Sequence, residues 1–217
     1  MSVVTGFLLT WASVSLKDRQ LANVALDKQK KILTALDLFN DNSLEREAIM
    51  SLYASTVKDL FLTSAGDLVS QASSENDLPI YVVYENDAIA KYVVPFEAFG
   101  LWSTIKGYFG LDGNGKSVIG FTVYDHAETP GLGAEVEKSW FAQQFIGKEI
   151  VNSDNQFVSI GVVKGGVKGK FNETQAKNYI DAISGSTITS KGLERDLKKE
   201  LAKYELFSAK LREGASE

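Results

Sequence analysis

The apolar residues of this 217-residue chain change their spacing near residue 78, and this change limits the folds that the chain can adopt. Before that point they recur at intervals of three and four, which predicts amphipathic helices. After it, short runs rich in Val, Ile, Tyr and Phe stand between turn residues, which predicts strands that alternate with helices. The expected helices cover residues 17–39, 45–62, 134–145, 173–183 and 191–211, and the expected strands cover 79–84, 89–94, 117–124 and 157–163.

Leading helices followed by strands that alternate with helices are typical of an α+β fold. We therefore predict an N-terminal helical arm followed by a mixed or antiparallel sheet core that helices flank. Residues 63–77 are polar and rich in Ser, and we interpret them as a loop. The chain accordingly divides into a helical arm with its connection, residues 17–77, and an α+β domain, residues 78–217.

The charged and metal-binding residues exclude several classes of function. The chain contains no Cys and one His, so thiolate metal sites, iron–sulfur clusters and multi-histidine sites are excluded, and we predict no metal site. The formal net charge is −5 and no long run of Lys and Arg occurs, which argues against nucleic-acid binding. If the chain carries out redox chemistry, it therefore needs an organic cofactor.

The first sixteen residues carry no charged side chain and precede a charged stretch at residues 17–19. A membrane-spanning helix needs about 20 apolar residues, and this segment is shorter and contains Thr and Ser. It also lacks the basic start and the small-residue cleavage site of a signal peptide. From these residues alone two interpretations stay open, an amphipathic or buried terminal segment and the outer half of a membrane helix.

The stretch SGSTITS at residues 184–190 is the most unusual segment, because five of its seven residues carry a hydroxyl group. It directly precedes the last expected helix, and Thr189 or Ser190 suits the N-cap of that helix. A cap needs only one of these hydroxyls. The free N–H groups at a helix N-terminus also bind anions, and Gly185 would let the backbone approach a phosphate closely. Capping and phosphate binding both fit the spacing.

Two further loops have the composition of a ligand site. Residues 125–133, between an expected strand and an expected helix, contain the single His of the chain, His126, and a Pro-Gly turn. Residues 99–104 place Trp102 beside Gly100, which suits either a wall for a planar ring or a plug for the core. For His126 we predict a surface or hydrogen-bonded structural role. The chain contains no GxGxxG dinucleotide loop.

In their order along the chain, these segments resemble the FMN-binding subunits of sodium-pumping NADH:quinone oxidoreductases and of the related Rnf electron-transport complexes. Residues 181–187 read DAISGST and match the D-x-x-[ST]-G-[AS]-T motif of that family, with Ser186 where Ala is common. Its ETPGLG motif stands at residues 128–133. The GLWS stretch at residues 100–103 is similar to the C subunit of the sodium pumps rather than to its Rnf counterpart. Residues 15–33 resemble the segment that leaves the membrane in that subunit.

The resemblance implies that FMN is joined through its phosphate to the hydroxyl of Thr187. We expect apolar side chains to contact the ring system, and hydroxyls near Thr187 to contact the phosphate. Glu128 and backbone N–H groups near Gly133 are expected to contact the ribityl chain or ring heteroatoms. No residue is expected to be catalytic by itself, because the electron transfer belongs to the flavin. The residues expected to bind the cofactor are Leu101, Trp102, Ser103, Glu128, Thr129, Leu132, Gly133, Ser184, Gly185, Ser186 and Thr189.

The implied function is electron relay within a membrane complex, as the C subunit of a sodium-pumping NADH:ubiquinone or menaquinone oxidoreductase. The implied partners are the other subunits of that complex and a flavin transferase, which attaches the FMN using FAD and a metal ion. By the same resemblance, residues 1–16 are the remnant of a single transmembrane anchor. The membrane is then a bacterial inner membrane, with the rest of the chain on its periplasmic side.

Three alternatives stay open beside this interpretation. An Rnf-type flavoprotein subunit has the same cofactor and belongs to a different complex. A non-redox extracytoplasmic binding domain with a decayed flavin motif is supported only by Ser186. A flavin reductase-like enzyme that binds NADH directly is disfavoured, because the chain lacks a dinucleotide-binding sequence.

Overall fold

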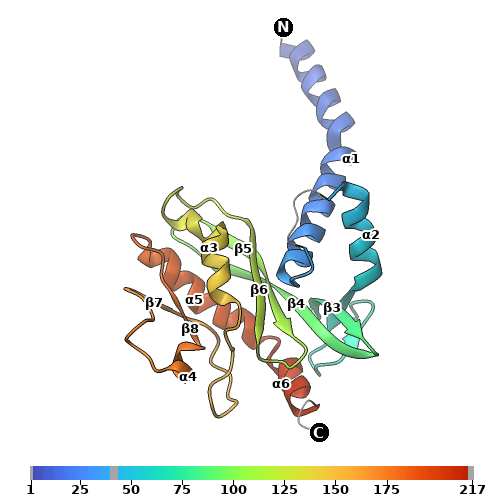
Figure 1. Ribbon diagram of the computed structural model, residues 1–217. Coiled ribbons are helices and arrows are strands. Elements are labelled where there is room, and N and C mark those ends of the chain that lie inside the picture. Colours follow the sequence, from blue (N-terminus) through green and yellow to red (C-terminus); the bar gives the residue numbers. More distant parts are fainter. Residues whose placement is uncertain (1, 40–43, 215–217) are drawn as a thin grey trace.

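A six-stranded antiparallel sheet forms the centre of the computed structural model, which describes residues 2–39 and 44–214 (Figure 1). In spatial order its strands are β2 (Leu68–Val69), β1 (Val57–Leu62), β3 (Leu78–Glu85), β4 (Ala88–Phe99), β5 (Thr104–Asp112) and β6 (Val118–Asp125). Strands β3 to β6 follow one another as a meander, and β1 and β2 form a hairpin at the β3 edge. The predicted α+β fold class is confirmed, since helices flank this sheet.

The sheet carries an apolar core on each of its faces, because alternate residues of a strand point to opposite sides. In β3, Ile80 and Val82 belong to one cluster of buried residues, and Tyr81 and Val83 belong to the other. Helices α1 (Ser2–Ala35) and α2 (Arg46–Thr56) cover the Tyr81 face. The opposite face is covered by α5 (Thr187–Ala202), α6 (Glu205–Gly214), α3 (Ser139–Ala142) and two 3-10 turns, η1 (Gly133–Glu137) and η2 (Gln143–Phe145).

The C-terminal part of α1 lies directly on two glycines of β5 and β6. A Cβ atom at Gly110 would come within 1.8 Å of the Ala35 carbonyl oxygen, and one at Gly120 within 2.3 Å. The Lys31 ammonium donates to the Val123 carbonyl oxygen at 2.8 Å and strengthens this contact. The other end of α1 extends away from the body of the molecule (Figure 1). Among the described residues, no helix combines the length and the apolar character needed to cross a membrane.

Two segments that the sequence predicts as helices change into strands part of the way along. The helix expected at 45–62 ends at Thr56, and β1 occupies the remainder and pairs with β3. The helix expected at 173–183 is reduced to the single turn α4 (Glu173–Ala176). It is followed by β8 (Tyr179–Asp181), which pairs in parallel with β7 (Gly161–Val163). Short apolar runs fit both periodicities, and pairing with a neighbouring strand decides between them.

The main sheet also contains two strands that the sequence does not predict. Strand β5 has no counterpart among the expected strands, because Gly107 and Gly110 weaken its strand pattern. Strand β2 lies within the loop expected at 63–77 and pairs with β1. Strands β1 and β2, although they lie upstream of residue 78, therefore belong to the same sheet as the strands that follow.

The remaining differences concern the ends of elements. The strands predicted at 79–84, 89–94 and 117–124 are confirmed as β3, β4 and β6, while the strand predicted at 157–163 is limited to β7. The helix predicted at 134–145 is divided into η1, α3 and η2. The helix predicted at 191–211 begins earlier, at Thr187, and is divided into α5 and α6. This earlier start affects the interpretation of the hydroxyl-rich segment.

Candidate cofactor site

Two loops and the start of helix α5, which are distant in the sequence, meet at one edge of the main sheet. The turn at residues 100–103 joins β4 to β5, and the loop at residues 126–132 follows β6. The antiparallel register of β5 and β6 places the start of β5 beside the end of β6. Helix α5 reaches the same edge because Gly192 lies against Phe99, where a Cβ atom would be 1.8 Å from the carbonyl oxygen.

A cavity of about 260 Å³ lies where these segments meet. Sites that enclose a whole small ligand usually measure roughly 300–1,000 Å³, so a flavin at this cavity would be only partly covered. Every predicted site residue except Ser103 and Ser184 lines the cavity. Ile188 also lines it; the motifs did not identify this residue, although it is an apolar residue within a hydroxyl-rich stretch. The lining residues are Leu101, Trp102, Glu128, Thr129, Leu132, Gly133, Gly185, Ser186, Thr187, Ile188 and Thr189.

The carboxylate of Glu128 connects the three segments and is only 5% exposed. Its Oε1 atom accepts the backbone N–H groups of Trp102 at 2.8 Å and Ser103 at 3.2 Å. Its Oε2 atom accepts the hydroxyl of Thr189 at 2.7 Å. Because the carboxylate already accepts from donors within the protein, little of its capacity is left for the flavin contacts expected from the sequence.

The surroundings of Glu128 favour its ionised form. Burial by itself raises the pKa of a carboxyl group. Hydrogen bonds from the Thr189 hydroxyl and from the backbone N–H groups of residues 101–103 outweigh this effect and hold the pKa of Glu128 below its ordinary value. Gly100 and Gly133 make room for the charged group, since a Cβ atom at either position would lie 2.5 or 2.2 Å from a carboxylate oxygen. The site therefore contains a buried carboxylate that is charged at neutral pH.

Helix α5 does not begin where the sequence indicated, and the expected cap at Thr189 or Ser190 is wrong. The helix begins at Thr187, and Ser186 occupies the N-cap position without a side-chain cap hydrogen bond. Thr189 instead donates to Glu128, and the Ser190 hydroxyl accepts a backbone N–H group from the preceding turn at 3.1 Å. The two hydroxyls thus attach the first turn of α5 to its surroundings, while its first N–H groups have no partner within the helix.

Thr187 is the first residue of α5 and lies exposed at the rim of the cavity. Its hydroxyl makes no hydrogen bond within the described part of the chain. The preceding turn contains Gly185 at φ +75°, where a Cβ atom would also lie 3.0 Å from Leu132. A free hydroxyl at this position can carry a phosphate, because the unpaired N–H groups and the helix dipole favour an anion.

The walls of the cavity are apolar side chains that stay largely exposed. Trp102 is 68% exposed, Ile188 61%, Leu101 46% and Leu132 42%. Exposed apolar side chains that gather at one place indicate a surface that a ligand or a partner covers. A planar ring system can pack against side chains of this kind.

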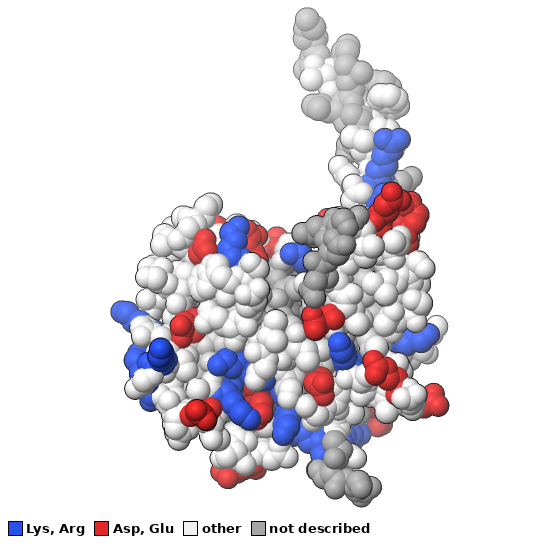
Figure 2. All heavy atoms as spheres, viewed as in Figure 1, with Lys and Arg blue, Asp and Glu red and all other residues white. Residues whose placement is uncertain are grey.

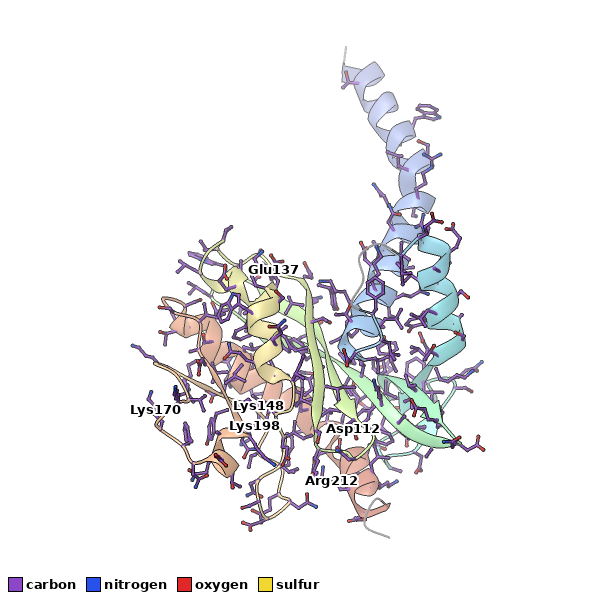
Figure 3. The ribbon with its side chains drawn as sticks, viewed as in Figure 1. Asp112, Glu137, Lys148, Lys170, Lys198 and Arg212 are labelled. Atoms are coloured by element: carbon purple, nitrogen blue, oxygen red, sulfur yellow. The ribbon has the colours of Figure 1, made fainter. Side chains whose placement is uncertain are left out.

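His126 lies beside the site and has a structural role. Its Nδ1 atom accepts the backbone N–H group of Glu128 at 3.2 Å. Its Nε2 atom lies 3.2 Å from a carboxylate oxygen of Glu137, which is labelled in Figure 3. With Nδ1 as the acceptor, the ring hydrogen of a neutral imidazole is on Nε2 and is donated to Glu137. The hydrogen bonds that the sequence analysis expected of His126 are present.

Among the described residues, three larger cavities contain none of the predicted site residues. The first, of about 580 Å³, is lined by residues of α5, β7 and β8, and the second, of about 480 Å³, by residues of α1 and β6. The third measures about 340 Å³ and is lined by residues near α4 and by residues 149–155. A fourth, of about 440 Å³, shares Thr187 and Ile188 with the candidate site. Within residues 2–39 and 44–214, no group of three or more His, Cys, Asp or Glu side chains is placed to bind a metal ion. We take the smaller cavity as the candidate site, because a free hydroxyl, a helix N-terminus and exposed apolar walls meet there.

Comparison with known proteins identifies a family and several proteins to which the chain is similar. Residues 100–202 match the FMN-binding domain family. The C subunit of the Na(+)-translocating NADH-quinone reductase of Vibrio alginolyticus is 31% identical to this chain, over 99% of the chain and 92% of that protein. The same subunit from Pasteurella multocida is 32% identical over the same fractions. The crystal structure of the C subunit from Parabacteroides distasonis has a TM-score of 0.74 and 30% identity, over 89% of this chain and 96% of that one.

Proposed function

The chain belongs to the family formed by the C subunits of the Na(+)-translocating NADH-quinone reductases, and from this membership we propose that it relays electrons through an FMN attached covalently to Thr187. It is part of an oxidoreductase complex and contains an FMN-binding domain. The covalent attachment is supported above all by the free Thr187 hydroxyl, which lies at the first turn of α5 and at the rim of a cavity with apolar walls.

The residues present fit this cofactor. Leu101, Trp102 and Leu132 offer apolar surface for the ring, and the absence of a side chain at Gly185 leaves room beside Thr187. When bound, FMN would supply reversible one- and two-electron transfer. Because a covalent bond would retain the cofactor, the shallow cavity only has to orient the ring. Contacts of FMN with Ser103, Thr129, Gly133, Ser184, Ser186 and Thr189 remain predictions.

The attachment is a group transfer from FAD that a separate flavin transferase performs with a metal ion. The Thr187 oxygen forms a bond to the phosphorus of the FMN half of FAD. The pyrophosphate bond to the other half breaks, AMP leaves, and the hydroxyl proton is released. The resulting phosphodiester keeps one negative charge, which the N-terminus of α5 stabilises by about 0.3–1 kcal/mol.

The proposal extends to partners and location. Other subunits of the complex would donate and accept the electrons. The end of α1 that extends from the body begins with residues that carry no charge, so we propose that it is part of a single membrane anchor. The body would then lie on the periplasmic side of a bacterial inner membrane. Acidic and basic side chains are interspersed on the face shown in Figure 2, so charge there does not favour one kind of partner.

The attachment is tested by coexpressing the chain with a flavin transferase and denaturing the product. We expect the wild-type band to fluoresce under ultraviolet light on a denaturing gel, and its mass to increase by that of the attached FMN. Thr187→Val has the same shape but no hydroxyl to attack phosphorus, so its fluorescence should vanish. Thr187→Ser keeps a hydroxyl and is the matched control, in which labelling should persist.

A wild-type chain that stays colourless with an active transferase would overturn the covalent site. Labelling of Thr187→Val at the wild-type level would move the attachment to another residue. Copurification with the other subunits of the sodium pump, rather than with those of an Rnf complex, tests the assignment of the partners.

A further inference from the structure

We propose that Glu128 is a positioning residue that assembles the flavin site before any flavin is attached, by holding the turn at residues 100–103 against its own loop and orienting the Thr187 end of α5 through Thr189. This inference rests on the proposed attachment of FMN to Thr187. It concerns the unmodified chain, whose folded site the transferase would recognise.

The hydrogen bonds of Glu128 join three parts of the chain that are distant in the sequence. Glu128 is separated from Trp102 by 26 positions and from Thr189 by 61. Its buried carboxylate needs these donors, because a charge removed from water is strongly unfavourable unless it is hydrogen-bonded. Moving any of these donors away would leave the buried charge with fewer hydrogen bonds, which is unfavourable. The two loops and the first turn of α5 therefore keep one arrangement before any flavin is attached.

The hydrogen bond of Thr189 bears on how the first turn of α5 faces the site. Successive residues of an α-helix are about 100° apart, so residues two positions apart point in roughly opposite directions. The Thr189 side chain is buried and points toward Glu128, whereas Thr187 is exposed. The hydrogen bond from Thr189 thus keeps the Thr187 hydroxyl at the rim of the cavity, where a transferase can reach it.

Matched variants of Thr189 separate this orienting role from a simple loss of stability. Thr189→Val keeps the shape of the side chain and removes the hydroxyl, while Thr189→Ser keeps the hydroxyl that donates to Glu128. Tyr92→Phe is the structural control, because it removes another buried hydroxyl contact, to Ser208 at 2.7 Å, at the opposite end of the sheet.

The experiment measures the initial rate of flavin transfer to each purified unmodified chain at increasing chain concentration. We expect Thr189→Val to be labelled roughly tenfold or more slowly than wild type, as for the loss of a hydrogen bond to a charged group. Thr189→Ser should recover most of the rate, and Tyr92→Phe should be labelled like wild type. Hydrogen exchange of the unmodified chain provides a second readout. The Ser190 N–H group, which bonds to the Ser186 carbonyl oxygen at 3.0 Å, should exchange faster in Thr189→Val only.

Wild-type labelling rates in Thr189→Val would overturn the proposal, and so would rates that fall in Tyr92→Phe as much as in Thr189→Val. If the wild-type chain takes up no flavin, the covalent site itself fails, and hydrogen exchange then decides the positioning role separately. Unchanged exchange of the Ser190 N–H group in Thr189→Val would reject that role, and faster exchange that Thr189→Ser reverses would support it.

Discussion

Glu128 makes the stability of the protein depend on pH, because its carboxylate is ionised while almost entirely buried. The hydrogen bonds that lower its pKa exist only in the folded chain. A carboxyl group whose pKa is lower in the folded state stabilises that state above the unfolded pKa, near 4.5. This contribution is lost as the pH falls through the folded pKa. At the scale of single residues, Glu128 therefore contributes both to the geometry of the site and to the stability of the fold.

Glu128→Gln is expected to lower the free energy of unfolding at pH 7, and the difference from wild type should shrink as the pH falls below about 4.5. The Gln amide oxygen still accepts the two backbone N–H groups, while its NH2 group replaces the oxygen that accepts from Thr189, so the variant loses the charge and the Thr189 hydroxyl has to act as an acceptor. Urea unfolding at a series of pH values measures the effect. Glu97→Gln, at a carboxylate that is 62% exposed, is the control and should change little. A difference that stays constant from pH 7 to strongly acidic pH would contradict the role assigned to Glu128.

Among the helices and strands, the contact between α1 and the sheet depends on close backbone packing. The glycines at positions 110 and 120 let the end of α1 lie against β5 and β6. Gly110 also makes strand β5 hard to predict from the sequence, because glycine in the interior of a strand weakens the strand pattern. Strand β1 was predicted as helix for a different reason, since its apolar residues also fit the helical spacing of the segment before it.

Gly120→Ala is expected to destabilise the folded chain by about 1–3 kcal/mol, the usual cost of overpacking a closely packed contact. The added Cβ atom would lie 2.3 Å from the Ala35 carbonyl oxygen, so α1 or β6 has to shift. Gly6→Ala, on α1, is the control, because no atom lies within 4 Å of the added Cβ atom. Urea unfolding should separate the two variants. Equal stability of Gly120→Ala and wild type would show that α1 does not sit on this glycine.

Across the whole molecule, the candidate site and a second buried polar contact lie at opposite ends of β5. The site is at the start of β5, whereas the turn after its last residue, Asp112, contacts α6. Arg212 of α6 is buried, donates to the Gly115 carbonyl oxygen at 2.8 Å and pairs with Glu205. Figure 3 labels Asp112 and Arg212 at this end of the sheet. Stability and flavin attachment should therefore respond separately to changes at the two ends.

Arg212→Met is expected to lower the free energy of unfolding by about 2–4 kcal/mol, since it removes a buried donor and leaves Glu205 without its charged partner. The flavin content of the chains that remain folded should stay at the wild-type level. Urea unfolding and flavin fluorescence per folded chain measure the two effects. Adding Glu205→Gln to Arg212→Met should restore part of the stability, because no unpaired charge remains. A loss of flavin content that parallels the loss of stability would contradict the separation.

The sequence by itself determined the features that depend on residues close together in the chain. Alternating apolar residues indicated strands β3, β4 and β6, and together with the helical spacing they indicated the α+β fold class. The motifs at residues 100–103, 128–133 and 181–187 identified the three segments that form the cavity, because each motif is a short continuous stretch.

Only the tertiary structure decided the features that depend on contacts between distant residues. It decided that residues 57–62 pair as a strand, because the pairing partner lies in another part of the chain. It decided that α5 begins at Thr187, because Thr189 and Ser190 are engaged outside their own helix. It also decided the surroundings of Glu128, whose charge is stabilised by donors from the turn at residues 100–103 and from the first turn of α5. Spacing within a sequence does not encode such contacts, since they form only when the folded chain brings the segments together.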